Sequence, residues 1–169
     1  SDLKMKFNLP TFSGNPELQK LVEVNEEFLN ENKNYQFKVD VADDASGTNA
    51  ASYTDKAAIV RQNGTVENIN NVNATAGITL KHGELAALNV DVGDFVRVTE
   101  VNGTEGYTKR QVDRTAPTKK TLEKKELGLA SDWHEIKKGT AGEERLFYQF
   151  FNTVEKANLS ITKKLDTNV

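Results

Sequence analysis

Three polar residues set in short apolar segments constrain this chain most strongly. Lys20, Glu100 and Asn152 lie in or at the ends of LQKLVEV, FVRVTE and LFYQFFN, respectively. Side chains alternate between the two faces of a strand, so each polar residue shares its face with the apolar residues two positions away. If those faces form the core, an amine, a carboxyl and a carboxamide all point into the interior. Because unpaired buried polar groups are costly, we expect these three groups to be bonded to one another.

Short β-prone segments separated by turn signals run through the chain. They cover residues 18–24, 35–41, 58–67, 78–80, 85–90, 95–101, 107–112 and 145–154. The segment 58–67 contains Asn63-Gly64 between two β-prone arms, which is typical of a hairpin. A short, mostly charged helix is expected from Thr118 to Leu129, after Pro117. The pattern predicts an all-β sandwich with a short helical insertion.

The composition excludes several classes of protein. With 169 residues and a net charge of only -3, the chain has no basic stripe of the kind that binds nucleic acid. No apolar run approaches the length of a membrane span, so we expect no membrane contact within this fragment. There is no cysteine, which excludes disulfides, thiol catalysis and cysteine-based metal sites.

Four motifs follow one another in a characteristic order: ITLKHGE at 78–84, VGDFVRVTE at 92–100, Gly106-Tyr107 and YQFFNT at 148–153. Together with the lysine of the first strand, they resemble the CnaB-type domains of Gram-positive surface proteins. The isopeptide-bonded domains of sortase-assembled pilins are the most similar. The resemblance spans roughly residues 17–157. It implies an immunoglobulin-like (CnaB-type) β-sandwich, in which a lysine and an asparagine condense and a glutamate promotes the reaction. These roles fall on Lys20, Asn152 and Glu100.

The chemistry that the resemblance implies suits buried side chains. Burial disfavours charge, so a neutral Lys20 amine and a protonated Glu100 are favoured. The acid can polarise the Asn152 carboxamide and relay protons while ammonia leaves. This is a single-turnover self-modification without a cofactor, so we do not expect an enzyme. A simple Lys–Glu ion pair with Asn152 as a turn residue remains the alternative. The rival Lys38 should face solvent, and the rival Asn158 follows the last strand.

The resemblance also bears on domain organisation and function. Residues 1–16 form a leading segment, 17–157 the domain, and 158–169 a linker or the first strand of a following domain, with Lys163 placed as Lys20 is. The implied function is a structural stalk or pilin domain, extracellular on a cell-wall-anchored pilus or adhesin. Its partners would be neighbouring domains or pilin subunits. The alternative is an adhesin module that binds a host protein or glycan through the segment 113–144.

Other chemistry has weaker support. His82 and His134 are the only histidines; both are expected to be exposed, and neither has metal-ligand spacing to a partner. Asp40, Asp43 and Asp44 lack the order of acidic residues found in calcium loops, which favours a solvated loop. We therefore expect no metal site.

Overall fold

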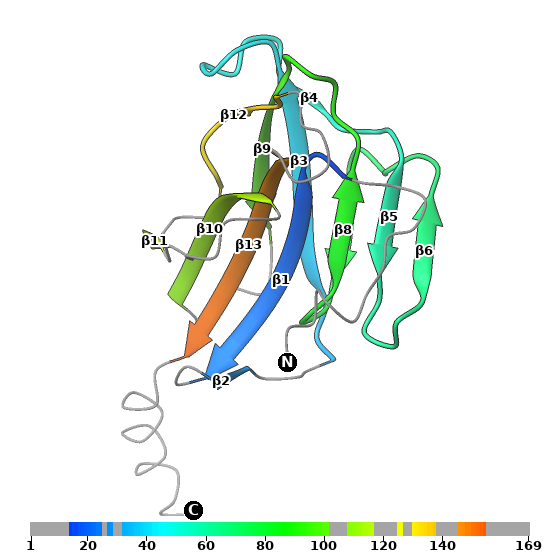
Figure 1. Ribbon diagram of the computed structural model, residues 1–169, viewed down its shortest axis with the longest axis vertical. Coiled ribbons are helices and arrows are strands. Elements are labelled where there is room, and N and C mark those ends of the chain that lie inside the picture. Colours follow the sequence, from blue (N-terminus) through cyan, green and yellow to red (C-terminus); the bar gives the residue numbers. More distant parts are fainter. Residues whose placement is uncertain are drawn as a thin grey trace, which may run out of the picture.

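The computed structural model describes residues 14–24, 27–28, 32–101, 108–116, 125–126, 130–137 and 145–154. These residues form two β-sheets packed face to face (Figure 1). The strands of the larger sheet are β1 (Glu17–Val24), β2 (Glu27–Phe28), β5 (Ala57–Val60), β6 (Val66–Ile69), β8 (Leu85–Leu88), β10 (Thr108–Ala116), β11 (Lys125–Glu126) and β13 (Arg145–Val154). The strands of the smaller sheet are β3 (Tyr35–Ala42), β4 (Ala51–Ser52), β7 (Ile78–Leu80), β9 (Phe95–Glu100) and β12 (His134–Glu135).

The larger sheet has the order β11-β10-β13-β1-β8-β5-β6, with β2 also paired to β1. The smaller sheet has the order β12-β9-β3-β4, with β7 also paired to β3. The first and last long strands, β1 and β13, are parallel neighbours, whereas the other described pairs of strands are antiparallel. The start of β1 and the end of β13 therefore lie at opposite ends of the sheet (Figure 1).

The core lies between the two sheets, because alternate residues of the strands face inward. Buried and half-buried residues alternate along β9 and most of β3, as half-buried strands require. The central cluster draws on both sheets and includes Leu18, Val22, Tyr35, Phe37, Val98, Tyr148 and Phe150. The outer face of the larger sheet also holds buried side chains, including Leu21 and Phe151, so β1 and β13 are buried on both faces.

The predicted β-sandwich is confirmed, and the predicted strand at 145–154 matches β13. The predicted hairpin around Asn63-Gly64 is also present, and a five-residue loop, 61–65, joins β5 to β6. Of the predicted helix at 118–129, only Lys125–Glu126 are described, and they form β11, so the helix prediction is wrong there. The rest of that segment lies outside the described residues. In the described part of the chain, no helix could span a membrane.

Candidate functional site

Lys20, Glu100 and Asn152 meet between the sheets. Lys20 on β1 and Asn152 on β13 share the inner face of the larger sheet, and Glu100 approaches from the end of β9 in the facing sheet. Lys20 Nζ lies 3.0 Å from Glu100 Oε1, and Asn152 Nδ2 lies 3.1 Å from Glu100 Oε2. The three side chains are 0%, 1% and 0% exposed. The predicted contact among them is therefore confirmed.

One carboxyl group thus contacts both potential reaction partners. Each Glu100 oxygen bonds a different one, the amine or the carboxamide. Half a turn of the Asn152 carboxamide about its Cβ–Cγ bond exchanges its oxygen and nitrogen, which are assigned from hydrogen bonding alone. In that orientation a protonated Glu100 donates to the carbonyl oxygen of Asn152. The arrangement can therefore both take a proton from the amine and polarise the amide.

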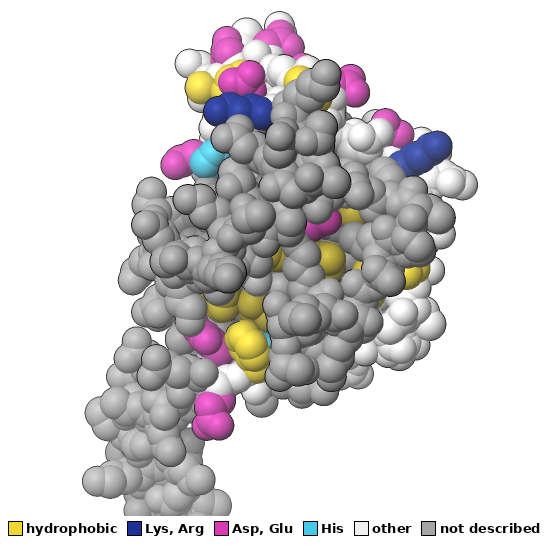
Figure 2. Space-filling view, viewed as in Figure 1, with side chains coloured by type: hydrophobic (Ala, Val, Ile, Leu, Met, Phe, Trp, Pro, Cys, Tyr) yellow, Lys and Arg dark blue, Asp and Glu magenta, His cyan; other side chains and the backbone are white. Residues whose placement is uncertain are grey.

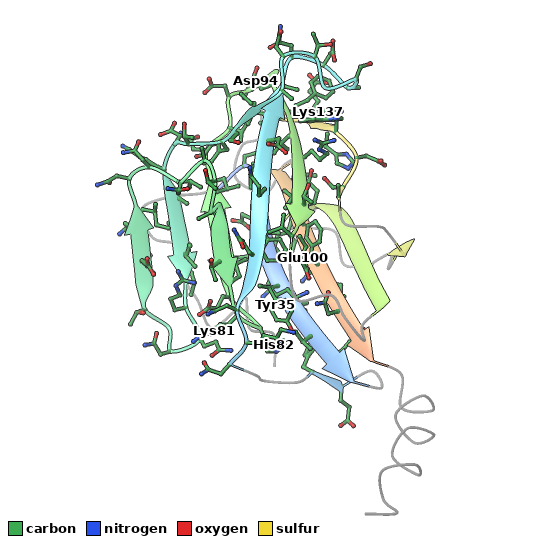
Figure 3. All side chains as sticks on the ribbon, turned by 180° about the vertical axis from the view of Figure 1, so that it is seen from behind. Tyr35, Lys81, His82, Asp94, Glu100 and Lys137 are labelled. Atoms are coloured by element: carbon green, nitrogen blue, oxygen red, sulfur yellow. The ribbon has the colours of Figure 1, made fainter. Side chains whose placement is uncertain are left out.

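Aromatic side chains surround the three groups. The ring centroid of Tyr35, on β3, lies 4.4 Å from Lys20 Nζ. Phe37 packs edge-on against Phe150 with ring centroids 5.4 Å apart. Tyr35 and Glu100 are 0% and 1% exposed, and Figure 3 labels both in the middle part of the molecule. Such an interior excludes water, which strengthens electrostatic contacts inside it and disfavours isolated charges.

The turn Lys81–Glu84 fixes β1 beside the site. Gly83 donates its N–H to the Lys20 carbonyl oxygen at 2.7 Å, and Lys20 donates its N–H to the Glu84 carbonyl oxygen at 3.2 Å. The buried Glu84 carboxylate accepts from the Arg61 guanidinium and from the backbone N–H groups of Gln62 and Lys81. The LKHGE motif therefore anchors the strand that bears Lys20. The sequence motif alone does not reveal this role of Glu84.

The rival residues do not join the site. Lys38 is half-buried on β3, on the face opposite to the core residues Phe37 and Val39. Asn152 lies within β13, two residues before its end, and is not a turn residue. Asn158 and Lys163 lie outside the described residues.

The prediction of two exposed histidines is wrong. His82 is 4% exposed, and its Nδ1 accepts the Val22 N–H at 2.9 Å. His134 is half-buried, with its ring centroid 5.9 Å from that of Tyr148. Both are held by neighbouring strands, which local sequence does not reveal.

In the acidic loop after β3, residues 43–50, the Asp44 side chain accepts hydrogen bonds from backbone N–H groups of the same loop. Acidic side chains gather at this end of the molecule (Figure 2). Asp44 Oδ1 accepts the N–H groups of Ser46 and Thr48 at 2.9 and 3.1 Å. Hydrogen bonds from Thr48, and then from Ser46, hold the pKa of Asp44 below its usual value. Within the described residues, no group of three or more acidic or histidine side chains is arranged to hold a metal ion.

Comparison with known proteins gives a family and a fold. Residues 17–131 match the family described as Domain of unknown function (DUF7601), a span that includes Lys20 and Glu100 but not Asn152. The major pilin of Streptococcus pyogenes has a similar fold, with a TM-score of 0.58, 15% identity, and coverage of 85% of this chain and 48% of the pilin. A mutant of that pilin gives a TM-score of 0.58, 15% identity and coverage of 85% and 49%.

The chain thus spans about half the length of the pilin structures that it matches. At this identity the likeness concerns the fold alone. No curated protein matches the sequence.

Proposed function

The chain belongs to the family described as Domain of unknown function (DUF7601), and we propose that it is a CnaB-type structural domain stabilised by an isopeptide bond between Lys20 and Asn152. The observation that supports this proposal is the single Glu100 carboxyl, bonded to both the amine and the carboxamide in a closed interior. Its two hydrogen bonds hold the amine and the carboxamide against the same carboxyl group. Proximity between reacting groups can lower a barrier by about 7 to 11 kcal/mol in well-oriented cases.

The reaction proceeds in balanced steps. Glu100 takes a proton from the Lys20 ammonium, leaving a neutral amine beside a carboxylic acid. The amine nitrogen attacks Cγ of Asn152, while the acid hydrogen-bonds the carbonyl oxygen and stabilises the charge that develops there. Glu100 then relays a proton from the attacking nitrogen to the amide nitrogen. The Cγ–Nδ2 bond breaks, ammonia leaves, and an Nζ–Cγ amide remains.

Burial favours the product over the unreacted state. A buried ion pair bears a desolvation cost that its attraction often fails to recover. Condensation removes the charge of Lys20 and leaves a neutral amide beside a protonated Glu100. The reaction happens once per chain and requires no cofactor, so the domain modifies itself and does not turn over a substrate.

The proposed bond suits a domain that carries load. It joins the parallel strands β1 and β13, and the start of β1 and the end of β13 lie at opposite ends of the sheet. We place the domain outside the cell, in a pilus or adhesin stalk of a Gram-positive surface, with neighbouring domains or pilin subunits as its partners. The pilin-like fold supports this placement.

Intact mass tests the proposal directly. The folded protein should weigh one ammonia less than its sequence, and peptide mapping should find Lys20 and Asn152 in one branched fragment. Glu100→Ala should fold but keep the full mass, because the proton relay is gone. Lys38→Ala is the control and should still lose ammonia. A wild-type protein of full sequence mass would refute the proposed bond.

A further inference from the structure

The His82 side chain accepts a backbone hydrogen bond from β1 at a position where β1 is paired with neither β8 nor β2. The pairing of β8 with β1 covers Glu17 to Gln19 and then gives way to the turn Lys81–Glu84. β2 pairs with β1 only at Glu23 and Val24. Between these two stretches, the Val22 N–H donates a hydrogen bond to the imidazole Nδ1 of His82 at 2.9 Å. Among the described residues, a side chain thus continues the hydrogen bonding along this edge of β1 between the two backbone pairings.

The imidazole is held firmly in this position. The His82 carbonyl oxygen accepts the Gln62 Nε2 at 2.9 Å, and the Phe28 ring packs against the imidazole with centroids 5.6 Å apart. Figure 3 shows His82 next to Lys81, at the end of the molecule towards which β1 runs. Because a backbone N–H points at Nδ1, that nitrogen must be the unprotonated acceptor. His82 is therefore present here as the tautomer with its proton on Nε2.

Val22 connects this histidine to the candidate site. Val22 is the register partner of Asn152 in the parallel pair and lies two residues after Lys20 on the same face. One side of the Val22 backbone faces β13, and the other side is bonded by His82. The position of β1 relative to Asn152 is thus set at Val22, between two fixed neighbours.

We infer that His82 is a positioning residue for isopeptide formation: its Nδ1 holds β1 at Val22 so that the Lys20 amine stays aligned with Asn152. This inference rests on the proposed function. The reacting atoms must approach within about 3 to 3.5 Å, and a misplacement of about 1 Å can slow such a reaction about 100-fold. The Lys20 side chain has several rotatable bonds, so its alignment depends on a fixed backbone beneath it.

Two substitutions of His82 test its hydrogen-bond acceptor and its aromatic ring separately. His82→Phe keeps an aromatic ring against Phe28 but removes the acceptor. His82→Asn loses the ring but keeps an acceptor, because Asn Oδ1 and His Nδ1 are both attached to Cγ and can occupy similar positions. Tyr53→Phe is the matched control, because the Tyr53 hydroxyl also accepts a backbone N–H, that of Asn89, at 3.0 Å. Asn89 follows β8, at the opposite end of that strand from His82.

The test is the rate of bond formation in the full chain. Cell-free synthesis with timed quenching, followed by intact mass, gives the fraction that has lost ammonia. His82→Phe should react about 10- to 100-fold more slowly than wild type, whereas His82→Asn and Tyr53→Phe should react at nearly the wild-type rate. Recovery by Asn is the result that general loss of packing would not produce.

Three results would overturn the inference: wild-type speed in His82→Phe, a folded His82→Asn as slow as His82→Phe, or equal slowing by Tyr53→Phe. If His82→Phe does not fold, the reaction rate of folded His82→Asn decides the question. A slow reaction in His82→Asn would then refute the positioning role of His82. A wild-type chain that never loses ammonia defeats the proposed function itself. If wild type loses ammonia and the His82 variants lose it at the same rate, only the positioning role of His82 is refuted.

Discussion

Pulling on the two ends of the domain should not unravel it. Force that enters at the start of β1 reaches Lys20 after three residues, crosses the proposed amide to Asn152, and leaves at Val154. Because β1 and β13 are parallel, this path runs along the sheet from one end to the other. The residues between Lys20 and Asn152 are bypassed and carry no load.

The length at stake follows from the sequence. Residues 21 to 151 number 131, and an extended chain spans at most about 3.3 to 3.6 Å per residue. Unravelling them would lengthen the molecule by roughly 430 to 470 Å. A chain that lacks the bond should show a step of that order, whereas the cross-linked chain should show none.

Single-molecule force spectroscopy can measure this step with handles attached at the two ends. Wild type and Lys38→Ala should stretch without the step, and Glu100→Ala should show it in full, because its chain remains open between Lys20 and Asn152. The reasoning is refuted if wild type, at forces below those that break covalent bonds, extends by the same length as Glu100→Ala.

Further predictions concern stability. Lys20→Ala and Asn152→Ala should each lower the melting temperature by about 10 to 20 °C, because a cross-link over roughly 130 residues contributes about 5 kcal/mol. Calorimetry of the double variant should show little further loss, and additive losses would argue against a shared bond. Burial raises the pKa of Tyr53 to about 12, whereas the unfolded phenol ionises near pH 10. The unfolding free energy should therefore fall between about pH 10 and 12, and urea titrations should show a smaller fall in Tyr53→Phe. Gly77→Ala should cost more than about 2 kcal/mol in urea unfolding, since the φ of Gly77 is +68° and an added Cβ would clash with the carbonyl oxygen of Phe37 on β3. Gly93→Ala has open space and should cost less, and an equal cost would contradict this account.

Local pattern was enough to predict most of the strands and their inward-facing residues, but not the two-residue strands β2, β4, β11 and β12. Period-two alternation placed Lys20 with Leu18 and Val22, and the structure puts all three in the interior. The cost of burying each group alone favoured contacts among Lys20, Glu100 and Asn152, and the resemblance to CnaB-type domains favoured Asn152 as their partner over Asn152 as a turn residue. These inferences succeeded because alternation and desolvation depend on nearby residues and on burial, both of which the sequence expresses.

Tertiary pairing accounts for what was missed. The charged segment at 118–129 has a helical composition, yet Lys125–Glu126 pair with β10, because the availability of a sheet edge outweighs weak local propensity. His82 looks like an exposed turn residue until Val22 is seen to need an acceptor on that side. Val22 needs this acceptor because the pairing of β8 with β1 stops at Gln19. The local sequence of β1 or β8 does not show where that pairing stops.

The pairing of the first strand with the last also sets an order of events during synthesis. At about 5 to 20 residues per second, β13 emerges on the order of 10 s after β1. During that interval β1 lacks its parallel neighbour, and pairing across so long a separation is slow in any case. Lys20 and Glu100 are both made before Asn152, so the triad is complete only when β13 docks. The proposed amide would then form after β1, β9 and β13 have come together, and would mark a domain in which these three strands are in place.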